Sequence, residues 1–419
     1  MLNFSPKWFT VLSILGLISG NAASYPIDGW ESSGIRRLVR LQLVLNGERK
    51  GTMPLPGAQR SISEIKLNLL GARGDSLVLL PEIDPKLQKE VEALFPNRHE
   101  SYALSLLDIT PGKPIRYAER LPNQQLSPGS VGKLLIAAGI FTELKAILQD
   151  EPERRRELLK TRLVVADKWI LSDHHEVPIY DPESGSYQFR IIKEGDVFNL
   201  FEWLDHMISA SNNSAASVVW KEALLMRAFG KNYPPSREQE VEYFEKTPKS
   251  ELAEMAGSIV NDPVRFIGIT ADEWRLGSFF TRTGQRMVPA TGGSVAAPRG
   301  YMKYLVALER GVLVDEWSCL EIKRLMYMTA RRIRYASAPR LAEAAVYFKS
   351  GSLYRCKQEE GFTCGKYMGN VENVMNSVAI VEQPDGRTYL VGMMSNVLKK
   401  NSAVEHQSLA TFIDRILLK

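Results

Sequence analysis

The sequence Leu126-Ser-Pro-Gly-Ser130-Val-Gly-Lys133-Leu-Leu-Ile-Ala-Ala138 places a serine and a lysine three residues apart at the start of an apolar run. On a helix, positions i and i+3 lie on the same face, so the Lys133 amine would reach the Ser130 hydroxyl. Serine is a weak nucleophile at neutral pH and needs a neighbouring base to take its proton. A lysine desolvated in an apolar helix has a lowered pKa and can act as that base. The stretch therefore predicts a nucleophilic serine at the start of a buried helix.

The same spacing also occurs at Ser63-Glu-Ile-Lys66, so spacing alone does not identify the nucleophile. Two strand-like segments, residues 102–108 and 115–119, precede Ser130 and are joined by a turn-forming Thr-Pro-Gly-Lys sequence. This pattern predicts a β-hairpin that leads directly to the serine. An apolar helix over residues 133–148 is expected to follow. The context favours Ser130 as the nucleophile.

Two further polar motifs occur downstream. Ser211-Asn-Asn213 separates two apolar segments with helical periodicity, residues 195–210 and a segment that starts at Ser214. A polar corner between buried helices can present side chains to a cleft, although Asn213 or Ser214 would also serve there as a helix N-cap. Lys349-Ser-Gly-Ser352 follows a strand-like segment that begins at Val346. Each motif thus lies at the end of a predicted helix or strand.

The order of the predicted elements indicates an α+β fold. After a long, mainly helical region, strand-like segments return over residues 377–382 and 389–394, and an amphipathic helix over 403–418 ends the chain. Strands near both ends of a chain that enclose helices predict an antiparallel sheet built from both chain ends. We expect this sheet to pack against a helical subdomain.

Residues 24–97 are predicted to form an N-terminal β-rich segment and helix of unknown role, followed by a main domain over residues 98–419. The strand prediction rests on alternating leucines at 41, 43 and 45. The helix is expected to start at Asp84-Pro85, with Asp as N-cap and Pro at the first helical position.

The first residues have the pattern of an export signal. Lys7 precedes an apolar run from Trp8 to Ile18, and small residues follow as far as Ala23. The run is too short to span a bilayer, so we predict a cleaved signal peptide over residues 1–23, with an uncleaved anchor as the alternative. The mature protein is therefore expected to be periplasmic or secreted, with no stable membrane span.

Composition and motifs argue against other partners and cofactors. The net charge of +5 is mild, and no Lys/Arg block with interleaved aromatic residues stands out, so no nucleic-acid partner is expected. Pro128 to Lys133 resembles a phosphate-binding loop, but its first glycine is misplaced and Leu134 replaces the required Ser or Thr. In Asp173-His-His-Glu176 the adjacent histidines point to different faces and no third ligand has helical spacing. No metal and no cofactor are predicted.

Three cysteines are present. In an exported protein, a disulfide between Cys356 and Cys364 would close a short loop, with Cys319 buried and free. Three reduced thiols are the alternative.

Together, Ser130-x-x-Lys133, Ser211-x-Asn213 and Lys349-Ser-Gly351 resemble the signature of class A β-lactamases and penicillin-binding proteins. From residue 102 to the end, the chain resembles the class A β-lactamase catalytic fold. The hairpin before the serine, the apolar helix before Ser211 and the strand at Asn376-Ser-Val-Ala-Ile-Val agree with this resemblance.

The resemblance implies a role for each motif residue. Ser130 would be acylated, Lys133 would be its base or proton relay, and Ser211 would pass a proton to the leaving nitrogen. The residues implied in substrate binding are Asn213, Lys349, Ser350, Gly351 and Ser352. Asn213 would hold the substrate amide and Lys133, and Lys349 would receive a substrate carboxylate with Ser350 and Ser352. An oxyanion needs preorganised N–H donors, for which the amides of Ser130 and Ser352 are expected.

One departure from the family pattern concerns deacylation. Class A β-lactamases carry a glutamate followed by Leu-Asn, which holds the hydrolytic water. The nearest match here is Glu273-Trp-Arg-Leu-Gly277, with glycine in place of asparagine. It follows the polar segment 231–265, which we interpret as a surface insertion. Glu273 is thus a candidate deacylating base, and an ordinary surface carboxylate is the alternative.

The predicted function is an exported serine hydrolase of the class A β-lactamase-like type, which forms an acyl-enzyme on Ser130 with β-lactams or related amides. A D-alanyl-D-alanine carboxypeptidase or transpeptidase-like peptidase, or an esterase, with slow deacylation is an alternative. Its D-alanyl peptide substrate would make peptidoglycan a partner. A non-catalytic envelope binding protein with this fold is a third alternative, against which the three intact motifs argue.

Overall fold

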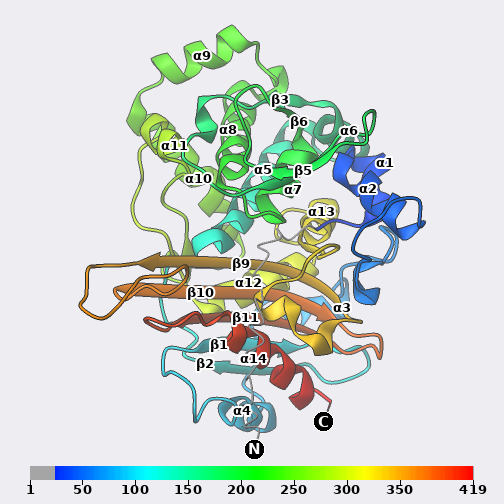
Figure 1. Ribbon diagram of the computed structural model, residues 1–419, viewed down its shortest axis with the longest axis vertical. Helices are drawn as coiled ribbons and strands as arrows, with labels where there is room; N and C mark the ends of the chain where they lie inside the picture. The colour runs from blue at the N-terminus through cyan, green and yellow to red at the C-terminus, as the bar shows by residue number, and fades with distance from the viewer. Residues whose placement is uncertain (1–23, 419) are drawn as a thin grey trace, which may run out of the picture.

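The computed structural model describes residues 24–418, so the predicted signal peptide at 1–23 lies outside the described residues. Its centre is a five-stranded antiparallel sheet in the order β2-β1-β11-β10-β9 (Figure 1). The strands are β1 (Ala103–Asp108), β2 (Arg116–Arg120), β9 (Ala345–Arg355), β10 (Glu372–Glu382) and β11 (Thr388–Asn396). β1 pairs with β11, with Leu106 opposite Val391, which confirms a sheet built from both chain ends.

Helices cover both faces of this sheet. Successive residues of a strand point to opposite faces, so Leu106 and Leu107 belong to different apolar clusters. Leu106 packs with residues of α4 (Pro85–Glu92) and α14 (Ala403–Ile416). Leu107 lies in the larger cluster that includes α12 (Pro298–Glu309). As predicted, α4 is capped by Asp84, whose carboxylate accepts the Leu87 N–H at 2.7 Å.

The helical subdomain lies beside β9, the edge strand (Figure 1). Its main helices are α5 (Lys133–Leu148), α6 (Pro152–Thr161), α7 (Leu200–Ile208), α8 (Asn213–Phe229), α9 (Arg237–Lys246), α10 (Lys249–Phe266), α11 (Arg282–Met287) and α13 (Glu316–Met326). Short strand pairs connect them: β3 (Leu163–Val165) with β6 (Val197–Asn199), β4 (Val177–Tyr180) with β5 (Tyr187–Arg190), and β7 (Trp274–Arg275) with β8 (Val295–Ala296). α5 packs against both α8 and α10, so its apolar sequence is buried all round.

The prediction that residues 231–265 form a surface insertion is wrong for α10. Leu252, Ala256 and Ile259 recur at helical spacing and are buried. The helix lies so close to α5 that a Cβ added to Gly139 would be 2.7 Å from the Ile259 carbonyl oxygen. The segment is polar in overall composition, but its apolar residues lie on one face of an amphipathic helix.

The prediction of a β-rich segment within residues 24–97 is also wrong. The regular elements there are helical and include α1 (Trp30–Ser33), α2 (Arg36–Leu45) and α3 (Ala72–Asp75). In α2, Leu38, Leu41 and Val44 share one face at a spacing of three residues, and this face packs inward. The alternation of leucines at 41, 43 and 45 is therefore incidental.

A buried ion pair and a hydrogen bond join this N-terminal segment to the rest of the fold. Arg37 of α2 makes a buried ion pair with Asp205 of α7 at 2.6 Å. The backbone N–H of Asn68 donates to the Glu309 Oε2 of α12 at 2.6 Å. Because Arg37, Asp205 and Glu309 are buried, breaking either contact would leave a buried polar group without a partner, so residues 24–97 stabilise the main fold.

The cysteines follow the sequence-based expectation. Cys356 and Cys364 form a disulfide in the β9–β10 connection, and Cys319 is free and buried in α13. Over residues 24–418, no helix combines the length and apolar character needed to cross a membrane.

Candidate active site

Ser130 and Lys133 meet where a short 3-10 helix, η3 (Gly129–Gly132), continues into α5. The Lys133 Nζ lies 2.8 Å from the Ser130 Oγ. The lysine side chain is fully buried, and this burial lowers the pKa of Lys133 to about 7. A substantial fraction of Lys133 is therefore neutral at physiological pH and able to accept a proton.

The Ser211–Asn213 motif supplies two more partners of the same amine. Lys133 Nζ donates to the Ser211 carbonyl and to the Asn213 Oδ1, each at 2.7 Å. Both oxygens can only accept hydrogen bonds. A neutral amine with its two protons on these oxygens directs its lone pair at Ser130, as a base requires. The left-handed backbone of Ser211, with φ of 58°, forms part of this corner.

Asn212, rather than the predicted Asn213 or Ser214, caps helix α8. Its Oδ1 accepts the Ala215 N–H at 2.7 Å. This capping leaves the Asn213 side chain available to Lys133.

Lys349 brings the third motif to the same point. Its Nζ donates to the Ser211 Oγ at 2.8 Å and to the Ser350 carbonyl at 3.0 Å. Burial, together with repulsion from the nearby cations Lys133 and Arg334, holds the pKa of Lys349 well below its usual value. An anionic group bound here would relieve that repulsion.

Strand β9 lies directly against η3. A Cβ added to Gly351 would be 2.8 Å from the Ser130 amide nitrogen, and one added to Gly129 would be 2.8 Å from the Ser352 amide nitrogen. Glycine at both positions allows this close approach. The two amides expected to bind an oxyanion are therefore on adjoining segments.

Arg334 is a site residue that the sequence reasoning did not find. It donates from Nη1 to the Gly351 carbonyl at 3.0 Å and from Nη2 to the Ser352 Oγ at 3.1 Å. Its guanidinium also lies 4.9 Å from the centre of the Tyr367 ring. Arg334 adds a third basic side chain to the site, beside Lys133 and Lys349. No spacing rule could have found it, because it reaches β9 only through the tertiary fold.

Glu273 is not part of this network. The Glu273 Oε1 lies 2.7 Å from the Nζ of Lys303 in α12, and the Oε2 accepts the Thr270 N–H at 2.9 Å. Leu276 and Phe280 of the same loop lie beside the serine motif instead, 3.0 and 3.7 Å from a Cβ added to Gly132.

The Phe280 ring covers Lys133, with its centre 4.5 Å from Nζ. At Gly277, where the family pattern has asparagine, an added Cβ would lie 2.2 Å from the Gly292 carbonyl oxygen. The fold leaves no room for the asparagine side chain. The side of Lys133 formed by this loop is consequently apolar.

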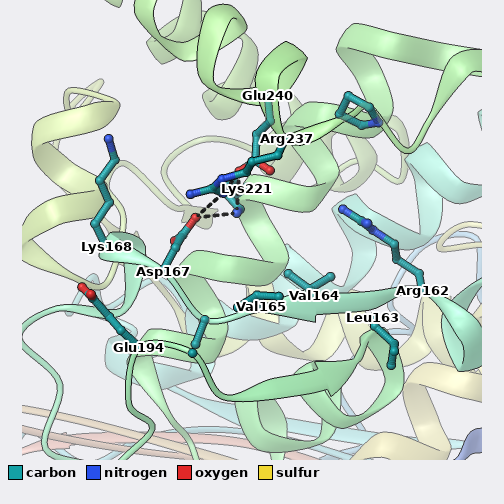
Figure 2. Close-up of a pocket in the computed structure, with 13 residues that line it drawn as sticks. Arg162, Leu163, Val164, Val165, Asp167, Lys168, Glu194, Lys221, Arg237 and Glu240 are labelled. Atoms are coloured by element: carbon teal, nitrogen blue, oxygen red, sulfur yellow. Dashed lines mark hydrogen bonds and ion pairs between the residues drawn. The ribbon is translucent and has the colours of Figure 1, made fainter.

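A cavity of about 720 Å³ lies elsewhere on the helical subdomain. Figure 2 shows Asp167 linked to Lys221 and Arg237 there, and Lys221 also binds Glu240 at 2.8 Å. Lys221 is eight residues along α8 from Asn213, which corresponds to about 12 Å. Asp167, Lys221, Arg237 and Glu240 pair with one another in this cavity, and none of the three motifs lines it.

Asp173, His174 and His175 come together, each offering a ligand atom within 4.8 Å of the others. The Asp173 carboxylate is already used, since it accepts the N–H groups of Asn213 and Ser214. The expectation of no metal stays a prediction.

The five-stranded sheet, the helical subdomain and the three joined motifs define a protein of the serine β-lactamase and transpeptidase-like superfamily. A sequence model described as "Beta-lactamase enzyme family" matches residues 86–416. The chain therefore belongs to the beta-lactamase enzyme family. A comparison with curated proteins gave no match.

Solved structures agree with this fold. A class A β-lactamase from Bacteroides cellulosilyticus is 14% identical, with a TM-score of 0.51, over 79% of this chain and 95% of that one. β-Lactamases from Sphaerobacter thermophilus and Chitinophaga pinensis are each 16% identical, and each match covers 80% of this chain. The matches cover 97% and 98% of those two chains. Their TM-scores are 0.48 and 0.49. At 14% identity, the likeness to the Bacteroides cellulosilyticus enzyme concerns the fold alone.

Proposed function

We propose that this protein is an exported serine hydrolase that forms an acyl-enzyme on Ser130 with β-lactams or related amides. The observation that carries the proposal is the position of Lys133 Nζ, 2.8 Å from the Ser130 Oγ and held by Ser211 and Asn213. Membership of the beta-lactamase enzyme family supports a hydrolase of this type.

In the proposed acylation, neutral Lys133 takes the Ser130 proton while Oγ attacks the amide carbonyl carbon. The carbonyl oxygen becomes an oxyanion, and the amides of Ser130 and Ser352 would donate to it. Collapse of this intermediate breaks the C–N bond and leaves an ester on Oγ. Ser211 gives its proton to the leaving nitrogen and is reprotonated through its 2.8 Å hydrogen bond with Lys349. Lys349 in turn recovers a proton from Lys133 or from solvent.

The preferred substrate is an anion. Lys133, Lys349 and Arg334 place three basic side chains at the site, which an anionic substrate would hold in their charged forms, and Arg334 also holds Ser352 in position. A substrate carboxylate on the leaving group, as in β-lactams and D-alanyl peptides, would bind Lys349 and the hydroxyls of Ser350 and Ser352.

A specific observation favours slow deacylation, as in a penicillin-binding D-alanyl peptidase. Glu273 is bound to Lys303, and the side chains of its loop that lie beside the serine motif, Leu276 and Phe280, are apolar and offer no carboxylate to a hydrolytic water. The peptidase is therefore our second candidate.

Labelling with a fluorescent penicillin tests the proposal. We expect covalent label on the wild type but none on Ser130→Ala. The control is Ser63→Ala, which removes the serine of the second Ser-x-x-Lys sequence and should still be labelled. A label that persists for hours would favour the peptidase, and rapid release would favour the β-lactamase. A folded wild type that takes no label from several β-lactams would instead favour a non-catalytic binding protein.

A further inference from the structure

The loop over residues 172–176 is hydrogen-bonded to the Ser211–Asn213 motif and to Ser214. The Asp173 Oδ2 accepts the backbone N–H groups of Asn213 at 2.7 Å and Ser214 at 2.9 Å. In the opposite direction, the Asn212 Nδ2 donates to the His175 carbonyl at 2.7 Å. The first turn of α8 and this loop therefore form one hydrogen-bonded unit.

His175 orients the carboxylate. Its Nδ1 lies 2.6 Å from the Asp173 Oδ1, which also accepts the backbone N–H groups of His174 at 2.8 Å and His175 at 3.1 Å. Burial would raise the pKa of Asp173, but the hydrogen bonds from His175 and from the amide of Ser214 hold it well below its usual value. Asp173 is thus ionised and can only accept, so Nδ1 of His175 carries the proton.

The charge of Asp173 acts on the proposed base. Burial lowers the pKa of Lys133, and the negative charge of Asp173 opposes this effect. Burial lowers the pKa of His175, and the positive charge of Lys133 lowers it further. Asn213 connects Asp173 with Lys133. Its backbone N–H donates to the Asp173 carboxylate, and its side-chain Oδ1 accepts from the Lys133 Nζ.

We propose that Asp173, oriented by His175, is a positioning residue for acylation that holds Asn213 against Lys133 and places a negative charge near the lysine. The proposal rests on the assignment of Lys133 as the base under the proposed function. The groups that interact electrostatically with the lysine are Asp173 and His175 on the loop and Lys349 on β9. His174 stacks on His175, and Arg334, in the segment before β9, acts on Lys349. Asp173 is the anion in this set, so its loss leaves the effect of burial on Lys133 unopposed.

The consequence is a specific change in pH dependence. Without the negative charge, Lys133 would lose its proton more readily, and the acidic limb of the acylation rate would move to lower pH by roughly one unit. The plateau rate would also fall, because Asn213 would be held less firmly. A merely structural role for Asp173 would lower the rate at every pH and leave the midpoint unchanged.

Asp173→Asn is the test variant, with the second-order rate of penicillin labelling measured between pH 5 and 9. Asp173→Ala is a second variant, since it removes both the charge and the hydrogen bonds to the N–H groups of Asn213 and Ser214. Asp181→Asn is the matched control, because Asp181 is an exposed carboxylate nearby in the chain whose side chain binds Ser184. We expect the midpoint to fall by roughly one unit in either Asp173 variant and to match wild type in the control. An unchanged midpoint in a folded variant would overturn the proposal.

A second readout does not depend on acylation. The titration of Lys133 can be followed by the ¹³Cε chemical shift in protein with labelled lysine, with Lys133→Ala to assign the signal. The same downward shift is expected in Asp173→Asn, and its absence would contradict the proposal. If wild type takes no label while this titration shifts, the proposed function fails and the electrostatic role of Asp173 stands.

Discussion

Replacement of Lys133 by alanine tests the chemistry of the site most sharply. The variant removes the amine that contacts the Ser130 Oγ, the Ser211 carbonyl and the Asn213 Oδ1. Loss of one proton-transfer group typically costs about 10²–10⁴ in rate. This range corresponds to about 2.7–5.4 kcal/mol of transition-state stabilisation. We expect the rate of acylation by a penicillin to fall within this range.

Two companion variants separate a base from a structural cation. Lys133→Arg keeps the positive charge but cannot lose its proton, so it should be as slow as the alanine variant. Lys66→Ala removes the exposed lysine of the second Ser-x-x-Lys sequence and should acylate like wild type. Thermal denaturation would establish that each variant is folded.

The assay is stopped-flow labelling with a fluorescent penicillin as a function of pH. Because burial lowers the pKa of Lys133 to about 7, the neutral fraction grows as the pH rises through this value. The wild-type rate should therefore rise about tenfold per unit well below pH 7 and level off above it. A loss of less than tenfold in folded Lys133→Ala, or a rapid Lys133→Arg variant, would refute the reasoning.

Three other variants test the surroundings of the site. Glu273→Gln should leave both labelling and release of penicillin close to wild type, because this carboxylate binds Lys303; a trapped acyl-enzyme in mass spectrometry would show that Glu273 is the deacylating base after all. Gly277→Ala should lower the free energy of unfolding by about 1–3 kcal/mol in urea denaturation, since its Cβ would lie 2.2 Å from a carbonyl oxygen, whereas Gly293→Ala has open space and should have little effect. Lys349→Ala should slow acylation by a carboxylate-bearing β-lactam at least tenfold but slow a methyl-ester analogue less, and equal losses for the two compounds would contradict its role as the carboxylate receptor.

The chemistry of Ser130 and Lys133 could be predicted because it depends on local spacing. Positions three apart at the start of an apolar helix meet whatever the rest of the fold does. Asn213 and Lys349 came from the family resemblance, and their hydrogen bonds bring all three motifs to one point. The central sheet followed from strands near both chain ends.

Features that depend on tertiary contacts could not be predicted in the same way. Arg334 reaches the site from a segment with no motif of its own. Asp173 belongs to a sequence that was considered only as a metal site, and its contact with Asn213 depends on the tertiary fold. Glu273 matched a pattern, but the loop that contains it brings Leu276 to the serine motif instead. In the N-terminal segment, the alternating leucines at 41, 43 and 45 predict a strand. The structure instead follows the helical spacing of Leu38, Leu41 and Val44.

The central claim is that Ser130 is the nucleophile, and peptide mapping after exposure to a β-lactam tests it most directly. Intact-mass spectrometry should show one adduct per chain, and digestion should place it on the peptide that contains Ser130. The Ser63→Ala variant should carry the same adduct, and Ser130→Ala should carry none. An adduct on the peptide that contains Ser63, or one retained in folded Ser130→Ala, would contradict the claim.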